Sequence, residues 1–287
     1  EARWERERAS LNRVGELREK LDQLNMQAQV AQREGNLERA SRLLYAEIPV
    51  IQKQLTEAEQ AELADEPGGE PRMVNEQVTD EDIAFLRDLR QTETLELSNT
   101  NVSDVGLEHL RGLTQLKTLS LSGGQFSDAG MEHLKGLTQL EGLYMTSCPV
   151  TDAGLEHLKT LTRLKWLSLF HTDVTDAWLA NLKGWTQLER LTLNWTVVTD
   201  AGLAHLKGLT KLRDLELWND AITDAGLAHL AGMTEIQSLD LSATDVAGPG
   251  LSHLKGLHKL EYLNLNNSRI TDEGLVQLGQ LTQIRRL

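Results

Sequence analysis

One aspartate returns at a constant interval through most of the chain, and this period restricts the fold more than any other property of the sequence. The interval is 24 residues with no insertion, and only Gly248 departs from the series. An unvarying period means that one structural unit is repeated and stacked on its neighbours. The aspartates are Asp80, Asp104, Asp128, Asp152, Asp176, Asp200, Asp224 and Asp272.

Each unit joins a strand-forming half to a helix-forming half, as in TDAGLEHLKTLTRLKWLSLFHTDV at residues 151–174. The L-x-x-L-x-L part predicts a short strand, and the G-L-x-x-L part predicts a helical turn whose leucines face the same core. The Thr-Asp pair is placed to cap that turn. Where the pair is lost, at Ala247-Gly248, Pro249 suits the first helical position. Because one unit cannot bury its own apolar face, neighbouring units must stack into a solenoid.

This unit resembles the leucine-rich repeat, and its TDAGL form is similar to arrays found in bacteria. The resemblance covers residues 79–287, about eight repeats followed by a truncated last one. It implies an α/β solenoid with a parallel sheet on the concave face. Because the last unit stops within its strand at Leu287, and the chain opens inside a helix without Met, we expect a fragment at both ends.

Residues 1–64 follow a different period, with apolar residues in alternating steps of three and four. This heptad spacing predicts two helices, which a turn at Gly35-Asn36 would fold into an antiparallel coiled-coil hairpin. Residues 65–78 are interpreted as a linker. Pro49 falls inside the second helix, where its missing donor and its ring predict a kink or a restart. The two seams are Val14, Leu17, Leu21, Leu24, Ala28 and Ala31, then Leu44, Ile48, Ile51, Leu55 and Ala58.

The same N-terminal stretch resembles the middle domain of the ClpB-type AAA+ disaggregases over residues 1–84. WERERASL, AQREGNLERASRLLYAEIPVIQKQL and MVNEQVTDEDIA follow one another in the family's order and spacing. The resemblance implies a coiled coil that regulates an ATPase ring and contacts a DnaK-type chaperone near its tip. Carried over by position, the regulatory or chaperone contacts are Arg33, Asn36, Arg39 and Tyr45.

Three departures limit this resemblance. The family has Gly after the tyrosine and Glu after the proline, where this chain has Ala46 and Val50. The segment after VTDEDIA runs into repeats instead of a second ATPase module. No GxxxxGK[ST] occurs, so the chain is not itself an ATPase.

Aromatic residues gather at repeat positions that vary between copies and are expected to point out of the concave face. Five of the six tryptophans lie between residues 166 and 218. Exposed aromatic rings are frequent interface hot spots, so these positions predict a partner-binding patch. The alternative is that the rings pack on one another and only stiffen the sheet. The predicted partner-binding residues are Tyr144, Trp166, Phe170, His171, Trp195, Trp218 and Tyr262.

Two further tryptophans fall outside these columns. Trp185 replaces a core leucine and is expected to be buried, whereas Trp178 replaces a glycine and has no clear place. Glu96, Asp214, Glu216 and Asp240 make parts of the predicted concave face acidic, which favours a basic or amphipathic partner.

The net charge of −14 disfavours nucleic acid and anionic membranes as partners. No apolar run approaches the roughly 18 residues of a membrane span, so a cytoplasmic location is expected. Six of the eight histidines share one repeat position in the helical half, but no regular co-ligand accompanies them, and neither a metal nor a cofactor is expected. Cys148 is single, which excludes an internal disulfide.

No set of residues for catalysis is visible, so the sequence predicts no enzyme. The leading hypothesis is a protein or peptide binder that uses the concave face. A second hypothesis is a fragment of a ClpB-like ATP-dependent chaperone whose ATPase domain lies outside this chain. A third is the substrate receptor of a ubiquitin-ligase-like complex, although no F-box-like segment precedes the repeats.

Overall fold

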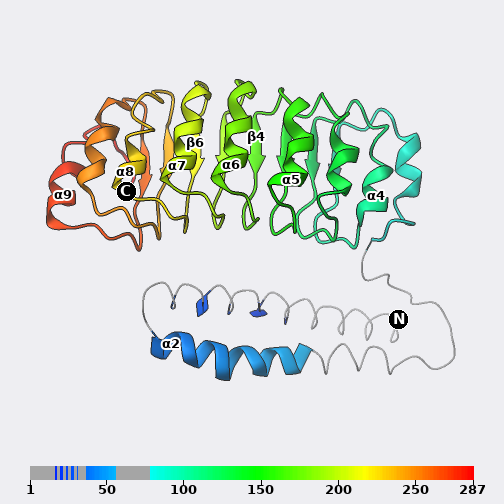
Figure 1. Ribbon diagram of the computed structural model, residues 1–287, viewed down its shortest axis with the longest axis horizontal. Helices are drawn as coiled ribbons and strands as arrows, with labels where there is room; N and C mark the ends of the chain where they lie inside the picture. The colour runs from blue at the N-terminus through cyan, green and yellow to red at the C-terminus, as the bar shows by residue number, and fades with distance from the viewer. Residues whose placement is uncertain are drawn as a thin grey trace. The chain divides into compact units, whose positions relative to one another are not determined.

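The computed structural model describes residues 17, 20, 21, 24, 27, 28, 31, 37–55 and 78–287 (Figure 1). The chain divides into two compact units, Glu1–Glu76 and Gln77–Leu287. The assignment of residues 1–64 to a hairpin domain and of 65–78 to a linker stays a prediction.

The described part of the first unit is helical. Helix α2 (Leu37–Arg42) leads into the π-helix η1 (Leu43–Glu47), and α-helix resumes over residues 48–55. The Ile48 amide donates to the Leu43 carbonyl, five residues back, so a wider turn precedes Pro49. The chain therefore stays helical through the proline, and its irregularity is the π turn instead of a restart. Leu24, Ala28, Leu43, Ile48 and Ile51 form one buried cluster.

The second unit is a parallel eight-stranded sheet in which strand order equals sequence order (Figure 1). Every strand pairs with the next at a register shift of one repeat, as in Leu95 with Leu119. The central leucine of each strand points into the core, and its two neighbours lie on the face opposite the helical segments. We call this second surface the outer sheet face. The strands are β1 (Thr94–Glu96), β2 (Thr118–Ser120), β3 (Gly142–Tyr144), β4 (Trp166–Ser168), β5 (Arg190–Thr192), β6 (Asp214–Glu216), β7 (Ser238–Asp240) and β8 (Tyr262–Asn264).

Short helical segments alternate with the strands and close the core on its other side (Figure 1). Three consecutive repeats use one α turn followed by one 3₁₀ turn, and the other repeats have a single helical segment. The segments are η2 (Ala84–Asp88), α4 (Asp104–Glu108), η3 (Gly130–Leu134), α5 (Asp152–Leu155), η4 (Glu156–Thr160), α6 (Asp176–Leu179), η5 (Ala180–Gly184), α7 (Asp200–Leu203), η6 (Ala204–Gly208), α8 (Asp224–Leu227), η7 (Pro249–Gly256) and α9 (Asp272–Leu278).

The repeat leucines form one continuous buried core, which confirms the predicted solenoid. Trp185 takes the place of a core leucine and is 1% exposed, as expected. Trp178, which the sequence left without a place, is equally buried and meets the Trp185 ring edge to face at 5.7 Å between centroids. The two tryptophans of this repeat, which stand where other repeats have glycine and leucine, therefore pack against each other in the core.

The predicted caps are present, but the aspartate acts across the border between repeats. Thr199 caps α7 by accepting from the Ala201 amide. The Asp176 carboxylate of the preceding repeat accepts from the Thr199 amide at 2.8 Å and from its hydroxyl at 2.6 Å. Equivalent pairs join Asp80 to Ser103, Asp104 to Ser127, Asp128 to Thr151, Asp152 to Thr175 and Asp200 to Thr223.

Ala247-Gly248 lacks the Thr-Asp pair, but the aspartate of the preceding repeat still forms hydrogen bonds across the border. Pro249 begins η7 at its first position, as predicted. The Asp224 carboxylate accepts from the backbone amides of Ala247, Gly248 and Gly250 at 2.6–2.9 Å, replacing the missing hydroxyl. Gly248 has φ +121°, and a Cβ there would collide with Gly274, so the position requires glycine.

The VTDEDIA segment belongs structurally to the solenoid. Thr79 forms a bridge with Asn101, and Asp82 accepts from the Thr79 amide and hydroxyl. Asp80 makes the first contact of the aspartate series, and Ile83 is buried in the repeat core. The stretch that resembles the end of a disaggregase middle domain therefore forms the first edge of the repeat array.

Candidate binding surface

Two rings from alternate repeats meet on the outer sheet face. Phe170 and Trp218 occupy the same repeat position, two residues beyond β4 and β6. Strands two apart in a sheet lie about 9.6 Å from each other, yet the ring centroids are 6.1 Å apart and nearly parallel at 27°. Both rings therefore lean toward the repeat between them, where Asn194 holds this position and is only 7% exposed.

Trp195 and His171 complete this group, which we call the aromatic cluster: Phe170, His171, Trp195 and Trp218. Trp195 meets Trp218 edge to face at 5.7 Å and meets His171 at 6.1 Å. Trp195 is 7% exposed, whereas His171 is exposed and Phe170 and Trp218 are half-buried. Trp195 thus supports the cluster, and the other three rings supply its surface.

The backbone turn after each strand aims these side chains. His171 and Trp195 have φ values of 55° and 59°, in the left-handed region that residues other than glycine rarely adopt. The same conformation recurs every 24 residues, at Asn99, Gly123, Ser147, His171, Trp195, Asn219, Ala243 and Asn267. The ring positions are therefore set by a turn that the whole array shares.

Hydrogen bonds hold the buried polar residues beside the aromatic cluster in place. The Asn194 side-chain amide donates to Glu216 at 2.9 Å, and its carbonyl accepts from the Trp218 backbone amide at 2.7 Å. Beside it, buried Asp220 accepts from the amide and hydroxyl of Thr196 at 2.8 and 3.1 Å. Sequence reasoning missed Asn194 and Asp220. The available signal was that Asp220 stands where most repeats have Thr or Ser.

The other predicted partner-binding residues lie outside the cluster. Trp166 and Tyr144 are half-buried on β4 and β3, and a Cβ on Gly142 would lie 3.3 and 3.5 Å from their rings. Glycine at that point leaves room for both. Tyr262 is on β8, where the Arg286 guanidinium lies 4.9 Å from its ring centroid. The seven predicted residues thus divide into one cluster, a neighbouring pair and one distant ring.

The predicted contacts on the hairpin are only partly described. Arg39 is exposed on α2, and Tyr45 belongs to the π-helix η1. Arg33 and Asn36 lie outside the described residues. The proposed chaperone contact therefore stays a prediction at all four positions.

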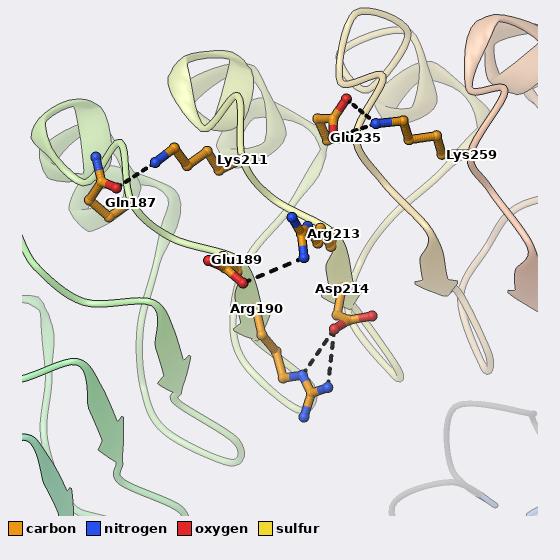
Figure 2. Close-up of polar contacts among 8 residues, drawn as sticks. All are labelled: Gln187, Glu189, Arg190, Lys211, Arg213, Asp214, Glu235 and Lys259. Atoms are coloured by element: carbon orange, nitrogen blue, oxygen red, sulfur yellow. Dashed lines mark hydrogen bonds and ion pairs between the residues drawn. The ribbon is translucent and has the colours of Figure 1, made fainter.

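Opposite charges pair between neighbouring repeats along the edge where the strands begin (Figure 2). Arg213 lies 3.8 Å from Glu189 and Lys259 lies 2.7 Å from Glu235, whereas Lys211 donates a hydrogen bond to the neutral Gln187 at 2.6 Å. Further ion pairs of this kind join Glu93 to Lys117, Glu141 to Lys165 and Glu261 to Arg285. The Lys165 ammonium lowers the pKa of Glu141, chiefly by donating a hydrogen bond to it. Charge balance across repeat borders is thus the rule in this array.

Other reactive side chains do not gather into a site in the described part of the chain. Arg87 and Arg111 contact His109 and His133, at 3.2 and 2.8 Å. No three His, Cys, Asp or Glu side chains among the described residues are arranged to hold a metal ion. Burial raises the pKa of the Cys148 thiol to about 11, so the nucleophilic thiolate is scarce near neutral pH. Of the helices that the structure describes, none is long and apolar enough to cross a membrane.

Comparisons with known proteins identify the class of the second unit. A family model described as "Leucine Rich repeat" matches residues 112–135 and 256–279. The crystal structure of internalin C2 from Listeria monocytogenes is similar, with a TM-score of 0.58 and 27% sequence identity. The similarity covers 70% of this chain and 83% of the internalin chain. The protein is a leucine-rich repeat solenoid, as the 24-residue period predicts.

The other resemblance is also found among curated proteins. Chaperone protein ClpB of Streptomyces albus is 47% identical over 81 residues, and that of Propionibacterium freudenreichii is 48% identical over 84 residues. These matches cover 28% and 29% of this chain but only 9% of each ClpB protein. The protein is therefore a leucine-rich repeat protein that also carries a ClpB-like segment, and it spans a small part of its curated relatives.

Proposed function

We propose that this chain is a non-enzymatic interaction protein that binds a protein or peptide through the aromatic cluster on the outer sheet face, the predicted concave face. The observation that carries the proposal is the Phe170–Trp218 pair, which stays half-exposed above the buried Trp195. Such rings supply a large contact area at small entropic cost because few torsions must be fixed. The exposed Val197, two residues after Trp195, adds apolar surface nearby.

The alternative that the rings only stiffen the sheet accounts for Trp195 but not for its neighbours. Trp195 is buried and contacts two other rings, as a structural residue would. Phe170 and Trp218 instead lean together over a polar residue and keep part of their surface open to solvent. A purely structural role requires no such exposure. Buried Trp195 therefore supports the sheet, and half-exposed Phe170 and Trp218 are available to bind a partner.

The test is to replace Phe170 and Trp218 together with alanine and to measure the affinity for a partner captured with the unmodified chain. We expect a loss of at least about 100-fold, because two hot-spot rings each contribute about 2 kcal/mol. Phe85→Ala is the control, since it removes an exposed ring on η2 that is not among the predicted partner-binding residues. A folded double variant, checked by circular dichroism, that binds within threefold of the unmodified chain would contradict the proposal.

A second candidate function rests on the ClpB-like segment. We infer that it gives the chain a chaperone contact, either with a DnaK-type chaperone or with an ATPase ring. The sequence identity of 47–48% to two ClpB proteins supports this inference. Arg39 is the candidate contact whose exposed position the structure describes.

Binding of the full chain to a purified DnaK-type chaperone is therefore expected in surface plasmon resonance. Arg39→Glu should weaken it at least about tenfold, the loss expected for a reversed interfacial charge. Lys53→Glu makes the same charge change at another exposed position of the second predicted helix and should have little effect. Equal losses in both variants would indicate general electrostatics and not a contact at the tip.

A further inference from the structure

The acidic residues of the outer sheet face are not equivalent. Asp214 forms an ion pair with Arg190 at 3.1 Å, so its charge is balanced within the chain (Figure 2). Glu96 lies on β1 and accepts from the Ser98 hydroxyl at 2.6 Å, far along the array from the aromatic cluster. Glu216 and Asp240, the other two acids of this face, lie nearer the cluster, and neither forms an ion pair with a residue that the structure describes.

Glu216 and Asp240 are direct neighbours in the sheet register of β6 and β7. Their hydrogen-bond partners are neutral: the Asn194 amide for Glu216, and the Asn264 amide and Ser242 for Asp240, at 2.5–2.9 Å. In the described part of the chain neither carboxylate forms an ion pair. Like charges directly opposite in a sheet are unfavourable. This pair therefore departs from the charge balance that the array maintains at Glu93–Lys117, Glu141–Lys165, Glu189–Arg213, Glu235–Lys259 and Glu261–Arg285.

The Glu216–Asp240 pair lies next to the exposed surface of the aromatic cluster. Glu216 ends β6, Leu217 continues the ladder of hydrogen bonds by donating to the Asp240 carbonyl, and Trp218 begins the turn that follows. Residues two apart at the end of a strand lie about 6.6 Å from each other. A partner in extended conformation repeats this spacing between its own residues i and i+2. One side chain of such a partner can cover the rings while the next on that face reaches the two carboxylates.

We propose that the partner of the aromatic cluster is an extended cationic segment of a protein. Its apolar side chain packs on Phe170 and Trp218, and its lysine or arginine, two residues away, lies between Glu216 and Asp240. The inference rests on the proposed binding function and adds the chemistry of the partner. The net charge of −14 also favours a cationic partner, because it attracts cationic segments at long range.

The test uses two labelled peptides and the full chain, with binding followed by fluorescence anisotropy. One peptide repeats Leu-Ser-Lys-Ser, which presents leucine and lysine two residues apart, and the other repeats Leu-Ser-Glu-Ser. We expect the lysine peptide to bind at least about tenfold more tightly, and increasing salt to weaken it because exposed charges are screened. Failure of the lysine peptide to bind, or equal binding of the two peptides, would overturn the inference.

Variants separate this inference from the proposed function. Glu216→Gln with Asp240→Asn keeps an oxygen acceptor at each position and should weaken the lysine peptide about tenfold while flattening its salt dependence. Glu235→Gln with Asp245→Asn is the matched control, since it changes the net charge equally but removes acids that already pair with Lys259 and Arg269. Circular dichroism verifies the fold of each variant.

The outcomes are distinct. If Phe170→Ala with Trp218→Ala abolishes peptide binding while the Glu216 and Asp240 variant leaves it unchanged, the cationic partner is rejected and the aromatic surface stands. If neither pair of changes affects binding, the aromatic surface is rejected as well. A loss of equal size in the Glu235 and Asp245 control would also reject the specific role of the Glu216–Asp240 pair.

Discussion

Replacing Trp185 with alanine should lower the free energy of unfolding by about 3–5 kcal/mol, the range for truncating a buried tryptophan. The side chain is 1% exposed and packs edge to face on Trp178. The flanking repeats place leucine at this position, and truncation to alanine leaves a cavity in the core. Urea denaturation followed by circular dichroism measures the change.

A pair of reversions tests whether the two tryptophans act together. Trp185→Leu and Trp178→Gly each restore the residue that the other repeats use. Each should destabilise when made alone, because it leaves a space against the remaining ring. The double variant should destabilise by less than the sum, with a coupling of about 0.5–3 kcal/mol, as for residues in direct contact. Strict additivity would show that the ring contact contributes little.

Asp176→Ala should lower the free energy of unfolding by about 2–3 kcal/mol. The substitution removes two hydrogen bonds to a charged acceptor and leaves the Thr199 amide and hydroxyl without their partner. Asp176→Asn keeps one carbonyl oxygen and should have a smaller effect. Both changes are measured by urea denaturation under one set of conditions.

The matched control for this prediction is Asp173→Ala, three residues earlier in the chain. Asp173 is exposed, so its removal should change the stability by less than about 0.5 kcal/mol. If the Asp176 and Asp173 variants lose the same stability, the hydrogen bonds across the repeat border do not explain why aspartate recurs every 24 residues.

The sequence was sufficient to predict the solenoid because its main determinant is periodic. The central leucine of each strand recurs at 24 residues, so one repeat describes all eight strands and their register. Burial of Trp185 and the helical start at Pro249 followed from the same comparison between repeats. These features depend on local chemistry that is visible within one unit.

Contacts between units were harder to predict. The Thr-Asp pair predicts a cap for its own helical turn, whereas the aspartate carboxylate accepts hydrogen bonds from the threonine or serine of the next repeat. The repeat position of Trp195 predicts an exposed ring, but the left-handed turn and the flanking rings bury it. Neither outcome follows from one unit, because both depend on where the next strand lies.

Hydrogen bonds such as Asp176–Thr199 determine how the array comes apart. Because each one crosses a border, it contributes to coupling between neighbours and not to the intrinsic stability of a repeat, and coupling of this kind sets how far unfolding spreads along a linear array. An array that keeps every such bond is expected to melt as one cooperative unit. An array that loses one in the middle gains a weak border, so its two halves become separate melting units.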